Sequence, residues 1–574
     1  MKKIISILMI VFVVFLNGQT TTWNGTSWSN GVPSANVDAV IAGNYSAYKN
    51  IIVKNFTVNA GFTYSIDEGG RLVVHGNVLN NGVIVVKNDA VMVQVNNTST
   101  YAGSGTMTVD RVAKLKRRDF NLWSSPVSGQ NVYNFSQGTP RNTIYVYDEA
   151  TDYYVTTGLN STSVFQPGIG YSIKGKSAYS TTVPTIETFT FTGVPNNGDI
   201  TVSLKKSTGL DKGYNLIGNP YPSNLNFRLL WSEANRNSIF NKQLFWTNLN
   251  GPMLQQGSNY AGNNYATFVA NVGGVGPTYV SNSVEEVSLR PTERTKVGQG
   301  FLVQAKYNNA PLTFRNSMRQ LIATGSTFYN KTELQDNNDE DENEDDEPEE
   351  EIIDRYWLKF VNPDNIANNI LIAHISEVTD NYDEDYDSAL FGLGDDAFYS
   401  AVGVNKLQIQ ARALPIKDSE VIKLGYKSSK AGNCIIALND KDGVFKNASK
   451  AIYLKDNQTE TVTNLQNEYY SFANDVVGTE NETRFSLLYE NNVLATNNIK
   501  AQEVSVYKQN NELVAKSNVN ISNVQVFDVS GRMIKNAVGN NTKEIRINTD
   551  ALNKGVYILK ITTVKGITTK KVII

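Results

Sequence analysis

The chain has 574 residues, enough for about three to five domains of ordinary size, which excludes a single small domain. Charged residues make up only 19% of it, and 55 acidic groups against 52 basic groups leave a net charge of -3. This balance argues against nucleic acid as a partner. Cys434 is the only cysteine, which excludes an intramolecular disulfide. The two histidines, His75 and His374, leave little acid–base or transition-metal chemistry.

Residues 1–18 predict a secretory signal peptide. Two lysines precede an almost unbroken apolar run, residues 4–16, which is shorter than the roughly 20 residues that a membrane-spanning helix needs. We expect cleavage near Gly18 and Gln19. No later stretch is long and apolar enough to cross a bilayer, so the mature chain is expected to have no transmembrane span.

Residues 19–110 predict a β-solenoid-like region or a β-meander. Short runs of β-branched residues alternate with polar residues, and glycines separate the runs. No strict repeat length can be read, so both architectures stay open. The residues expected to point inward are Val58, Ile66, Leu72, Val74, Ile84, Val86, Val91 and Val93.

Residues 111–326 suggest two tandem β-modules produced by an internal duplication. The segment FNLWSSPVS, which begins at Phe120, resembles YNLIGNPYPS, which begins at Tyr214. An aromatic strand and then a strand at Gly170 or Gly300 follow in the same order in each copy. The second copy is longer, and we expect its residues 250–283 to form a long surface loop.

Residues 327–351 predict an acidic, flexible linker. Residues 336–351 hold twelve acidic groups and no basic group. Like charges repel and offer no apolar surface, so this run cannot collapse into a core. A solvated spacer is the favoured interpretation, and a loose site for divalent cations is the alternative.

Residues 352–490 predict a β-sandwich, because seven segments of alternating apolar and polar residues are separated by turn residues. His374 and Cys434 lie inside two of these segments. No second histidine or thiol lies nearby to complete a catalytic triad or a metal site. We therefore expect both to be core residues.

Catalytic motifs are absent from the sequence. It contains no G-x-S-x-G elbow, no Walker loop and no H-E-x-x-H motif, so enzymes that depend on these motifs are excluded. A glycosidase with two paired carboxylates needs no local motif, so this class of enzyme stays open. Asp383, Asp385 and Asp387 alternate in a run that could hold calcium, although an exposed acidic loop is favoured and no cofactor is expected. A basic cluster is expected on the wet face of a strand: Arg111, Lys114, Lys116, Arg117 and Arg118.

Aromatic residues leave a glycan-binding surface open. The chain has 6 tryptophans and 29 tyrosines, and exposed aromatic rings are the usual platform for sugars. Trp246 and Trp357 lie in alternating strands, where we expect buried rings. Trp23 and Trp28 are expected to cap the first β-layer.

Residues 499–574 carry the most specific pattern. They combine D-x-x-G-[RK], G-x-Y-x-[LVI]-[KR] and a glycine-centred hairpin that runs into a basic, β-branched end. The segment resembles the C-terminal sorting domain of the type IX secretion system of Bacteroidota, and its strand pattern predicts about seven short strands in a small Ig-like β-sandwich. The residues that carry the resemblance are Asp528, Gly531, Arg532, Gly555, Tyr557, Leu559, Lys560, Gly566, Lys570 and Lys571.

The resemblance implies export through the periplasm by the type IX secretion machinery, and an extracellular or outer-cell-surface location. The segments WSSPVSG, GNPYPS, VGQGF and IQARALP are similar to motifs of flavobacterial surface proteins with the same tail. Asp387, Ser388 and Ala389 fit the short O-glycosylation pattern of that phylum.

The sequence therefore predicts an all-β, multidomain, non-enzymatic protein of the cell surface or the medium, an adhesin-like or matrix component. A glycan-binding module for the capture of surface polysaccharide is the alternative, and a divergent glycosidase is the third hypothesis.

Overall fold

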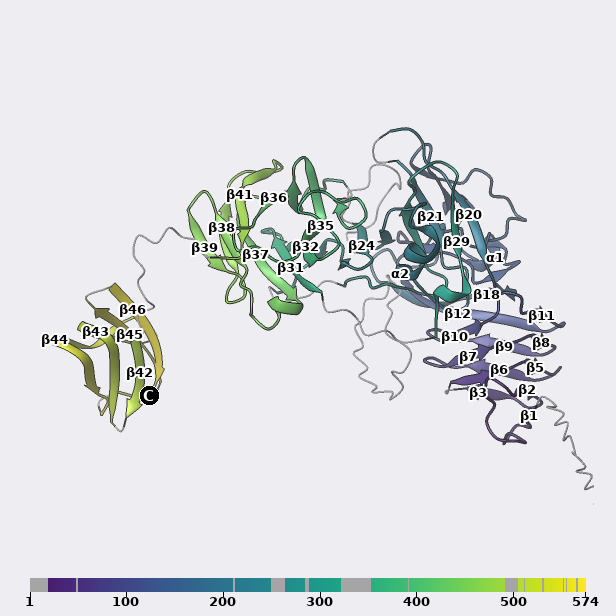
Figure 1. The fold of residues 1–574 in the computed structure, drawn as a ribbon, viewed down its shortest axis with the longest axis horizontal. Helices are drawn as coiled ribbons and strands as arrows, with labels where there is room; N and C mark the ends of the chain where they lie inside the picture. The colour runs from purple at the N-terminus through teal and green to yellow at the C-terminus, as the bar shows by residue number, and fades with distance from the viewer. Residues whose placement is uncertain are drawn as a thin grey trace, which may run out of the picture. The chain divides into compact units, whose positions relative to one another are not determined.

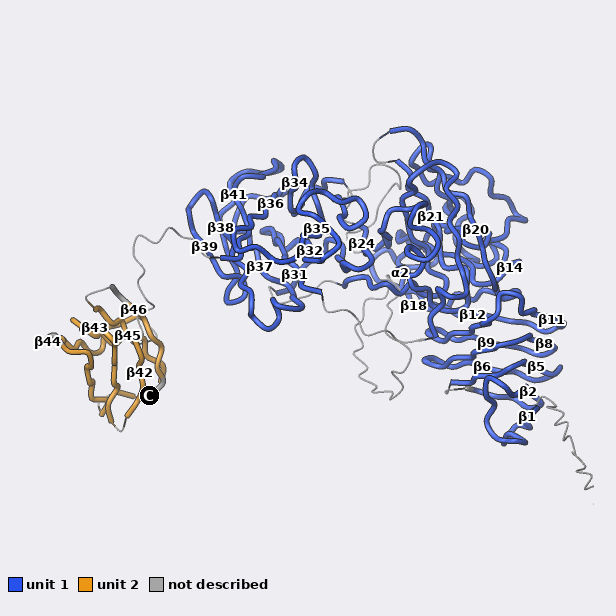
Figure 2. The backbone as a smooth tube through the Cα atoms, viewed as in Figure 1, with its two compact units in different colours: residues 1–491 blue, residues 492–574 orange. Residues whose placement is uncertain are grey.

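The computed structural model describes residues 19–47, 50–209, 212–248, 264–283, 289–321, 353–390, 392–490, 504–509, 511–528, 531–550, 552–553, 555–563 and 566–574. The protein is all-β, as the sequence predicts. It consists of two compact units, the N-terminal unit, Met1–Asn491, and the C-terminal unit, Asn492–Ile574 (Figure 2). The predicted signal peptide, 1–18, and the predicted linker, 327–351, lie outside the described residues.

The N-terminal unit begins with a β-solenoid whose parallel strands stack along three faces (Figure 1). Successive coils begin at Asp38, Phe56, Val78 and Tyr101, so the repeat length varies and is hard to read from the sequence. The faces are β1 (Thr20–Trp23), β2 (Asp38–Ile41), β5 (Phe56–Val58), β8 (Val78–Asn80) and β11 (Tyr101–Ala102); β3 (Tyr45–Ala47), β6 (Thr63–Ile66), β9 (Val83–Val86) and β12 (Thr106–Leu115); and β4 (Ile51–Val53), β7 (Arg71–Val74) and β10 (Val91–Gln94).

The interior of the solenoid is filled by alternate side chains, and seven of the eight predicted inward residues belong to its core. Val93 is the exception. It pairs with Val73 on the outer side of β10, whereas Met92 pairs with Leu72 and enters the core. The prediction for Val93 is wrong because both sides of β10 are buried. Apolar residues therefore occur on both sides of the strand, and their pattern does not show which side faces the core.

Two modules with the same strand order follow the solenoid. The first sheet is β13-β17-β15-β16, and the second is β21-β28-β23-β24 with β25 added at its edge. The landmarks that suggested a duplication occupy equivalent strands of these sheets. The strands are β13 (Phe120–Trp123), β15 (Ile144–Asp148), β16 (Tyr153–Val155), β17 (Tyr171–Lys174), β21 (Tyr214–Gly218), β23 (Gln243–Trp246), β24 (Tyr265–Val269), β25 (Gly273–Val275) and β28 (Gly300–Gln304).

Smaller elements complete the modules. In each module a short helix follows the first strand, and an asparagine side chain caps its N-terminus. The helical elements are α1 (Val132–Phe135), η1 (Arg141–Thr143), α2 (Phe227–Leu229), η2 (Leu230–Asn235) and η4 (Asn316–Met318). The remaining strands are β14 (Val127–Ser128), β18 (Thr185–Thr192), β19 (Val194–Pro195), β20 (Ile200–Leu204), β22 (Asn224–Asn226), β26 (Tyr279–Val280), β27 (Arg294–Thr295), β29 (Ala310–Phe314) and β30 (Arg319–Gln320).

The prediction of a long surface loop at 250–283 is wrong for the described residues 264–283. They contain three strands, and β24 and β25 are fully buried. The following strand, β26, pairs with β32 of the next domain, and the indole Nε1–H of Trp357 donates to the carbonyl of Gly274 at 2.8 Å. A segment rich in glycine and asparagine is interior here because a distant part of the chain covers it.

Residues 354–489 form one continuous sheet around a main core, and Trp357, Leu371 and Ile409 on its other side pack against the second module. All seven predicted segments are strands. Strand β40 is at one end of the sheet, and β41 is near the other end. The ring centres of Phe472 in β40 and Phe485 in β41 are nevertheless 4.8 Å apart, so the sheet curls around its core. The elements are β31 (Asp354–Val361), β32 (Ile366–Ile375), β33 (Ser388–Ala389), β34 (Ala397–Val402), β35 (Asn405–Ala413), β36 (Val421–Lys427), β37 (Gly432–Lys441), η5 (Gly443–Phe445), β38 (Tyr453–Asp456), β39 (Thr461–Asn464), β40 (Tyr470–Asn474) and β41 (Asn481–Leu488).

The predicted solvent-facing basic cluster is only partly solvent-facing. Arg117 and Arg118 are exposed in a turn, but Arg111 is 2% exposed. The guanidinium of Arg111 donates to the carbonyls of Val297 and Ala90. The prediction is wrong for Arg111 because the Val297 carbonyl of the second module and carbonyls of the solenoid itself satisfy its donors.

The C-terminal unit is a sandwich of five strands, not about seven. The order is β42-β43-β45-β46, and β44 pairs with the other edge of β43. Two of the strands have 16 residues each, and the register shifts along their pairing replace the expected strand breaks. The strands are β42 (Val504–Gln509), β43 (Glu512–Phe527), β44 (Met533–Asn548), β45 (Val556–Thr563) and β46 (Gly566–Ile573).

Candidate functional site

The D-x-x-G-R residues of the tail form one closed hairpin between β43 and β44. The Asp528 N–H donates to the Arg532 carbonyl, and the Gly531 N–H donates to the Asp528 carbonyl, both at 3.0 Å. The Arg532 N–H and Nε–H donate to the Asp528 carboxylate at 3.0 and 3.1 Å. Gly531 has φ +80°, as expected for a turn glycine. Aspartate, glycine and arginine at this spacing therefore define a single turn.

The second motif joins β45 to the last residue of the chain. The Gly555 N–H donates to the Ile574 carbonyl at 3.1 Å, and the Ile574 N–H donates to the Gly555 carbonyl at 3.0 Å. Tyr557 and Leu559 lie in the core, and the Tyr557 hydroxyl donates to the Asn553 carbonyl at 2.9 Å. The apolar positions of the motif thus build the sandwich and hold its final strand in place.

The basic positions of the tail differ in exposure. Lys570 and Lys571 are exposed on β46, and Lys560 on β45 is half-buried. Gly566 is the first residue of β46. The turn of the predicted glycine-centred hairpin includes residues 564–565, which lie outside the described part of the chain.

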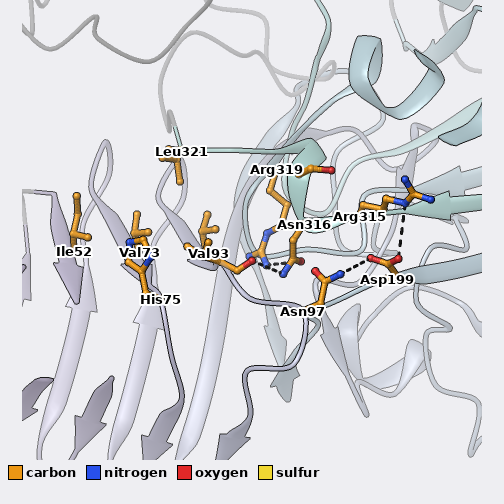
Figure 3. A pocket seen from close by; sticks show the side chains of 12 residues that line it. Ile52, Val73, His75, Val93, Asn97, Asp199, Arg315, Asn316, Arg319 and Leu321 are labelled. Carbon is orange, nitrogen blue, oxygen red and sulfur yellow. Dashed lines mark hydrogen bonds and ion pairs between the residues drawn. The ribbon is translucent and has the colours of Figure 1, made fainter. Parts of the chain in front are cut away.

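A groove lies on the outer side of the third solenoid face (Figure 3). Ile52, Val73 and Val93 stand in a row on the adjacent strands β4, β7 and β10. The volume is about 810 Å³, within the usual range of ligand sites. The other lining residues are His75, Val95, Asn97, Asp199, Arg315, Asn316, Ser317, Arg319 and Leu321.

Arg319 seals the edge strand β10 at the bottom of the groove. Its guanidinium donates to the carbonyls of Met92, at 2.7 Å, and Gln94, at 3.2 Å, and to the Ser223 hydroxyl at 2.9 Å. It also lies 4.8 Å from the ring centre of Tyr221. Burial lowers the pKa of Arg319 to about 10. The side chain is fully engaged, so its role is to satisfy carbonyls at the edge of strand β10, where Pro222 and Asn316 supply further hydrogen bonds.

The rim of the groove is polar and more open. Asp199 accepts from the Asn97 side chain at 2.9 Å and lies 3.8 Å from the Arg315 guanidinium. Arg315 and Asp199 are both about half exposed. Aliphatic side chains beside a carboxylate, a guanidinium and amides fit an amphipathic chain such as an oligosaccharide. Among the described residues that line the groove, Asp199 is the one carboxylate, whereas paired-carboxylate hydrolysis needs two.

The acidic run 380–387 is tied to the rest of the unit. The Asp387 carboxylate accepts from the N–H groups of Asp383, at 2.8 Å, and Ala411, at 2.7 Å. Asp385 pairs with Lys306 at 2.9 Å. Asp387 is 1% exposed, and burial raises its pKa to about 7. The exposed-loop prediction is therefore wrong for Asp387, since backbone amides from two segments hold it inside.

In the described part of the chain, no group of three or more histidine, cysteine, aspartate or glutamate side chains is placed to hold a metal ion. Ser388 of the predicted O-glycosylation site is 3% exposed. Its hydroxyl is therefore shielded once the chain has folded.

His374 and Cys434 are core residues, as predicted. His374 is 1% exposed, its Nε2 lies 2.6 Å from the Tyr489 hydroxyl, and burial lowers its pKa to about 4. Cys434 is completely buried, and burial raises the pKa of its thiol to about 11. A neutral histidine and a protonated thiol inside an aromatic core are inert at neutral pH.

The tryptophans mostly serve as packing residues. Trp246 and Trp357 are buried, as predicted, and so are Trp123 and Trp231. Trp23 and Trp28 are partly buried and pack against Tyr45 beside the first coil of the solenoid, which fits the predicted cap. Over the described residues, the tryptophans do not form the exposed row that would mark a sugar-binding platform.

Within the ranges that the structure describes, no helix has the length and hydropathy to cross a bilayer.

The fold defines an all-β protein with a solenoid, two modules of one topology, a curled sheet and a separate C-terminal sandwich. Residues 15–489 match the model of a domain of unknown function, DUF8693, and residues 494–574 match that of another, DUF8694. The first match covers most of the chain, so the chain belongs to the DUF8693 family. The boundary between the matches coincides with the boundary between the two units. No curated protein matches the chain.

Proposed function

We propose that this protein is exported by a type IX secretion system and that its C-terminal unit is the sorting domain. The observation that carries the proposal is the way in which the tail motifs fold. Asp528, Gly531 and Arg532 close one hairpin, and Gly555 pairs with the final residue Ile574. A compact unit with its own core suits recognition as an export signal.

The route begins at the predicted signal peptide 1–18, with cleavage near Gly18 and Gln19. The chain then passes through the periplasm to the type IX machinery, and it ends extracellularly or on the outer cell surface. The motif glycines and Tyr557 build the shape of the sorting domain. The exposed Lys570 and Lys571 are available for contact with the machinery.

The N-terminal unit is proposed to be a non-enzymatic scaffold, an adhesin-like or matrix component. The buried side chains of Arg111 and Arg319 join its solenoid to its second module. Arg111 donates to the carbonyl of Val297, 186 positions away in the sequence, and Arg319 donates to the carbonyl of Met92, 227 positions away. Two side chains suited to nucleophilic or general-base catalysis, Cys434 and His374, are interior packing residues. A unit of this kind is suited to present a binding surface to a partner outside the cell.

Glycan capture is the second candidate function, and the groove on the solenoid favours it. An aliphatic row beside Asp199, Arg315 and Asn97 can contact the apolar face and the hydroxyl groups of a sugar chain at the same time. Retention of the purified protein on a panel of polysaccharides tests this function. Loss of retention in Asp199→Ala and Arg315→Ala is expected if the groove is the site.

Deletion of residues 492–574 tests the export proposal. In a host with a type IX secretion system, the shortened chain should accumulate in the periplasm, and the full chain should reach the surface or the medium. A reporter that carries a signal peptide and residues 492–574 should be exported from the same host. Surface delivery of the shortened chain would overturn the sorting assignment.

A further inference from the structure

One side of the C-terminal unit, called the outer face here, consists of the side chains of β44, β43, β45 and β46 that point away from the core. Val524 and Val526 of β43 point inward. The alternate residues Asn523, Gln525 and Phe527 therefore point outward. The strand pairing places the outward residues of neighbouring strands directly beside them.

An apolar row crosses the outer face. Phe527 lies directly opposite Met533 on one neighbouring strand and opposite Ile558 on the other. Met533 is 51% exposed and Ile558 is 40% exposed. Val538, opposite Asn523, is 72% exposed. Contiguous exposed apolar residues in a small unit mark an interaction surface more often than isolated ones do.

Lysines flank the apolar row. Lys571 lies opposite Ile558, and Lys560 lies opposite Gln525. Around them, on residues 523–527 of β43 and on β45 and β46, the described outward positions are asparagine, glutamine, threonine and apolar residues, without a carboxylate. At the other end of the face, Glu512 and Glu544 both pair with Arg546. Residues 492–574 hold 12 basic and 5 acidic groups, so the positive charge extends beyond the face. A complementary surface would be acidic around an apolar centre.

The outer face and the tail motifs share strand β45. Tyr557 and Leu559 enter the core from this strand, and Ile558 and Lys560 emerge on the outer face. The same residues that specify the sandwich therefore also set the position of the exposed pair. Packing in the core accounts for the residue types at Tyr557 and Leu559, but it does not account for those at Ile558 and Lys560, which lie outside the core.

We infer that the outer face is the docking surface of the C-terminal unit for a protein receptor of the export machinery, one that presents apolar side chains bordered by carboxylates. The inference rests on the proposed sorting function and names its contact surface. Ile558 and Phe527 form the apolar contact, and Lys560 and Lys571 pair with the receptor's carboxylates. Apolar anchors at the centre with charged groups at the rim are the usual arrangement of such interfaces.

The experiment measures export of the full chain in a host with a type IX secretion system. The variants are Ile558→Glu with Lys560→Glu, and Lys571→Glu alone. The matched control is Tyr507→Glu with Lys508→Glu, which changes an exposed aromatic residue and a lysine on β42, outside the outer face. The chain without residues 492–574 is the reference for failed sorting. Thermal unfolding of each purified full-length variant verifies that its C-terminal unit is folded.

The expected result is at least about a tenfold loss of exported protein for the double outer-face variant, a smaller loss for Lys571→Glu, and normal export of the control. Normal export of folded outer-face variants, together with retention of the shortened chain, would overturn the inference and leave the sorting function standing. Export of the shortened chain would overturn the sorting function itself.

Two binding measurements decide between the receptor and other occupants of the face. Sedimentation velocity of the purified full chain tests for a dimer that Ile558→Glu dissociates. Co-sedimentation with vesicles of phosphatidylethanolamine and phosphatidylglycerol tests for a lipid surface. Either a dimer or vesicle binding that depends on the outer face would overturn the receptor assignment. A monomer without vesicle binding supports it.

Discussion

The hairpin at Gly531 can be tested by substitutions that change only the backbone energy. Gly531 has φ +80°, and an added Cβ would meet no atom within 4 Å. Side-chain crowding therefore contributes nothing to the cost of a substitution. The left-handed conformation costs an ordinary L-residue about 1–2 kcal/mol. Asparagine adopts this conformation more readily, and β-branched valine adopts it least readily.

These energies predict a graded loss of stability in the C-terminal unit. In a domain of this size, 1 kcal/mol shifts the Tm by about 4–8 °C. Gly531→Ala should therefore lower the Tm of the unit by about 5–15 °C, Gly531→Val by more and Gly531→Asn by less. Scanning calorimetry of the full chain measures the shift, and the chain without residues 492–574 identifies the transition. Gly531→Val should also reduce export.

Gly555→Ala is the matched control. An added Cβ at Gly555 also meets no atom within 4 Å, and its φ lies outside the left-handed region. This substitution should leave the Tm nearly unchanged. Equal shifts for Gly531→Ala and Gly555→Ala, or equal shifts for Gly531→Asn and Gly531→Val, would refute the assignment of the cost to the turn.

Three further predictions concern the N-terminal unit. Cys434→Ala should cost about 1 kcal/mol in urea unfolding and leave any binding unchanged, because the thiol only packs; loss of binding with an intact fold would contradict this. Asp387 has a pKa raised to about 7, so the folded state holds its proton more tightly than the unfolded state. Relative to Asp387→Asn, the free energy of unfolding should therefore fall by up to about 4 kcal/mol as the pH rises from 4 to 7, and a pH-independent difference in urea titrations would exclude this. Arg319→Ala should cost about 3 kcal/mol or more by removing the guanidinium donor of the buried Met92 carbonyl together with the other hydrogen bonds of this buried side chain, and the half-exposed Arg315→Ala less than about 1 kcal/mol; similar costs in denaturant unfolding would argue against the sealing role.

Local patterns in the sequence predicted much of the fold. Alternation of β-branched residues identified the strands and most of the solenoid core. Repeated landmarks near Phe120 and Tyr214 pointed to two modules, which share one strand order. The turn glycine Gly531 and the core positions Tyr557 and Leu559 could be read from their spacing, because hairpins and strand faces are decided by neighbouring residues.

The residues that lie side by side on the outer face of the C-terminal unit could be identified only from the strand pairing. Ile558 and Lys560 could be assigned to one side of a strand from the sequence. Their position beside Phe527 and Lys571 depends on the register with two other strands. A one-residue slip in either register would move these side chains to the opposite side. The short hairpin between β45 and β46 is a local signal for the register with Lys571, but no local signal specifies the register with Phe527 on the distant strand β43.

Burial of polar residues was decided by tertiary structure alone. The sequence predicts a solvent-facing Arg111, but the carbonyl of Val297, 186 positions away, accepts from its guanidinium in the interior. Asp387 belongs to an acidic run, yet Ala411 holds it inside. The glycine-rich residues around Gly274 are interior because Trp357 covers them. In each case a partner far along the chain offsets the cost of removing a polar group from water, and composition cannot indicate such a partner.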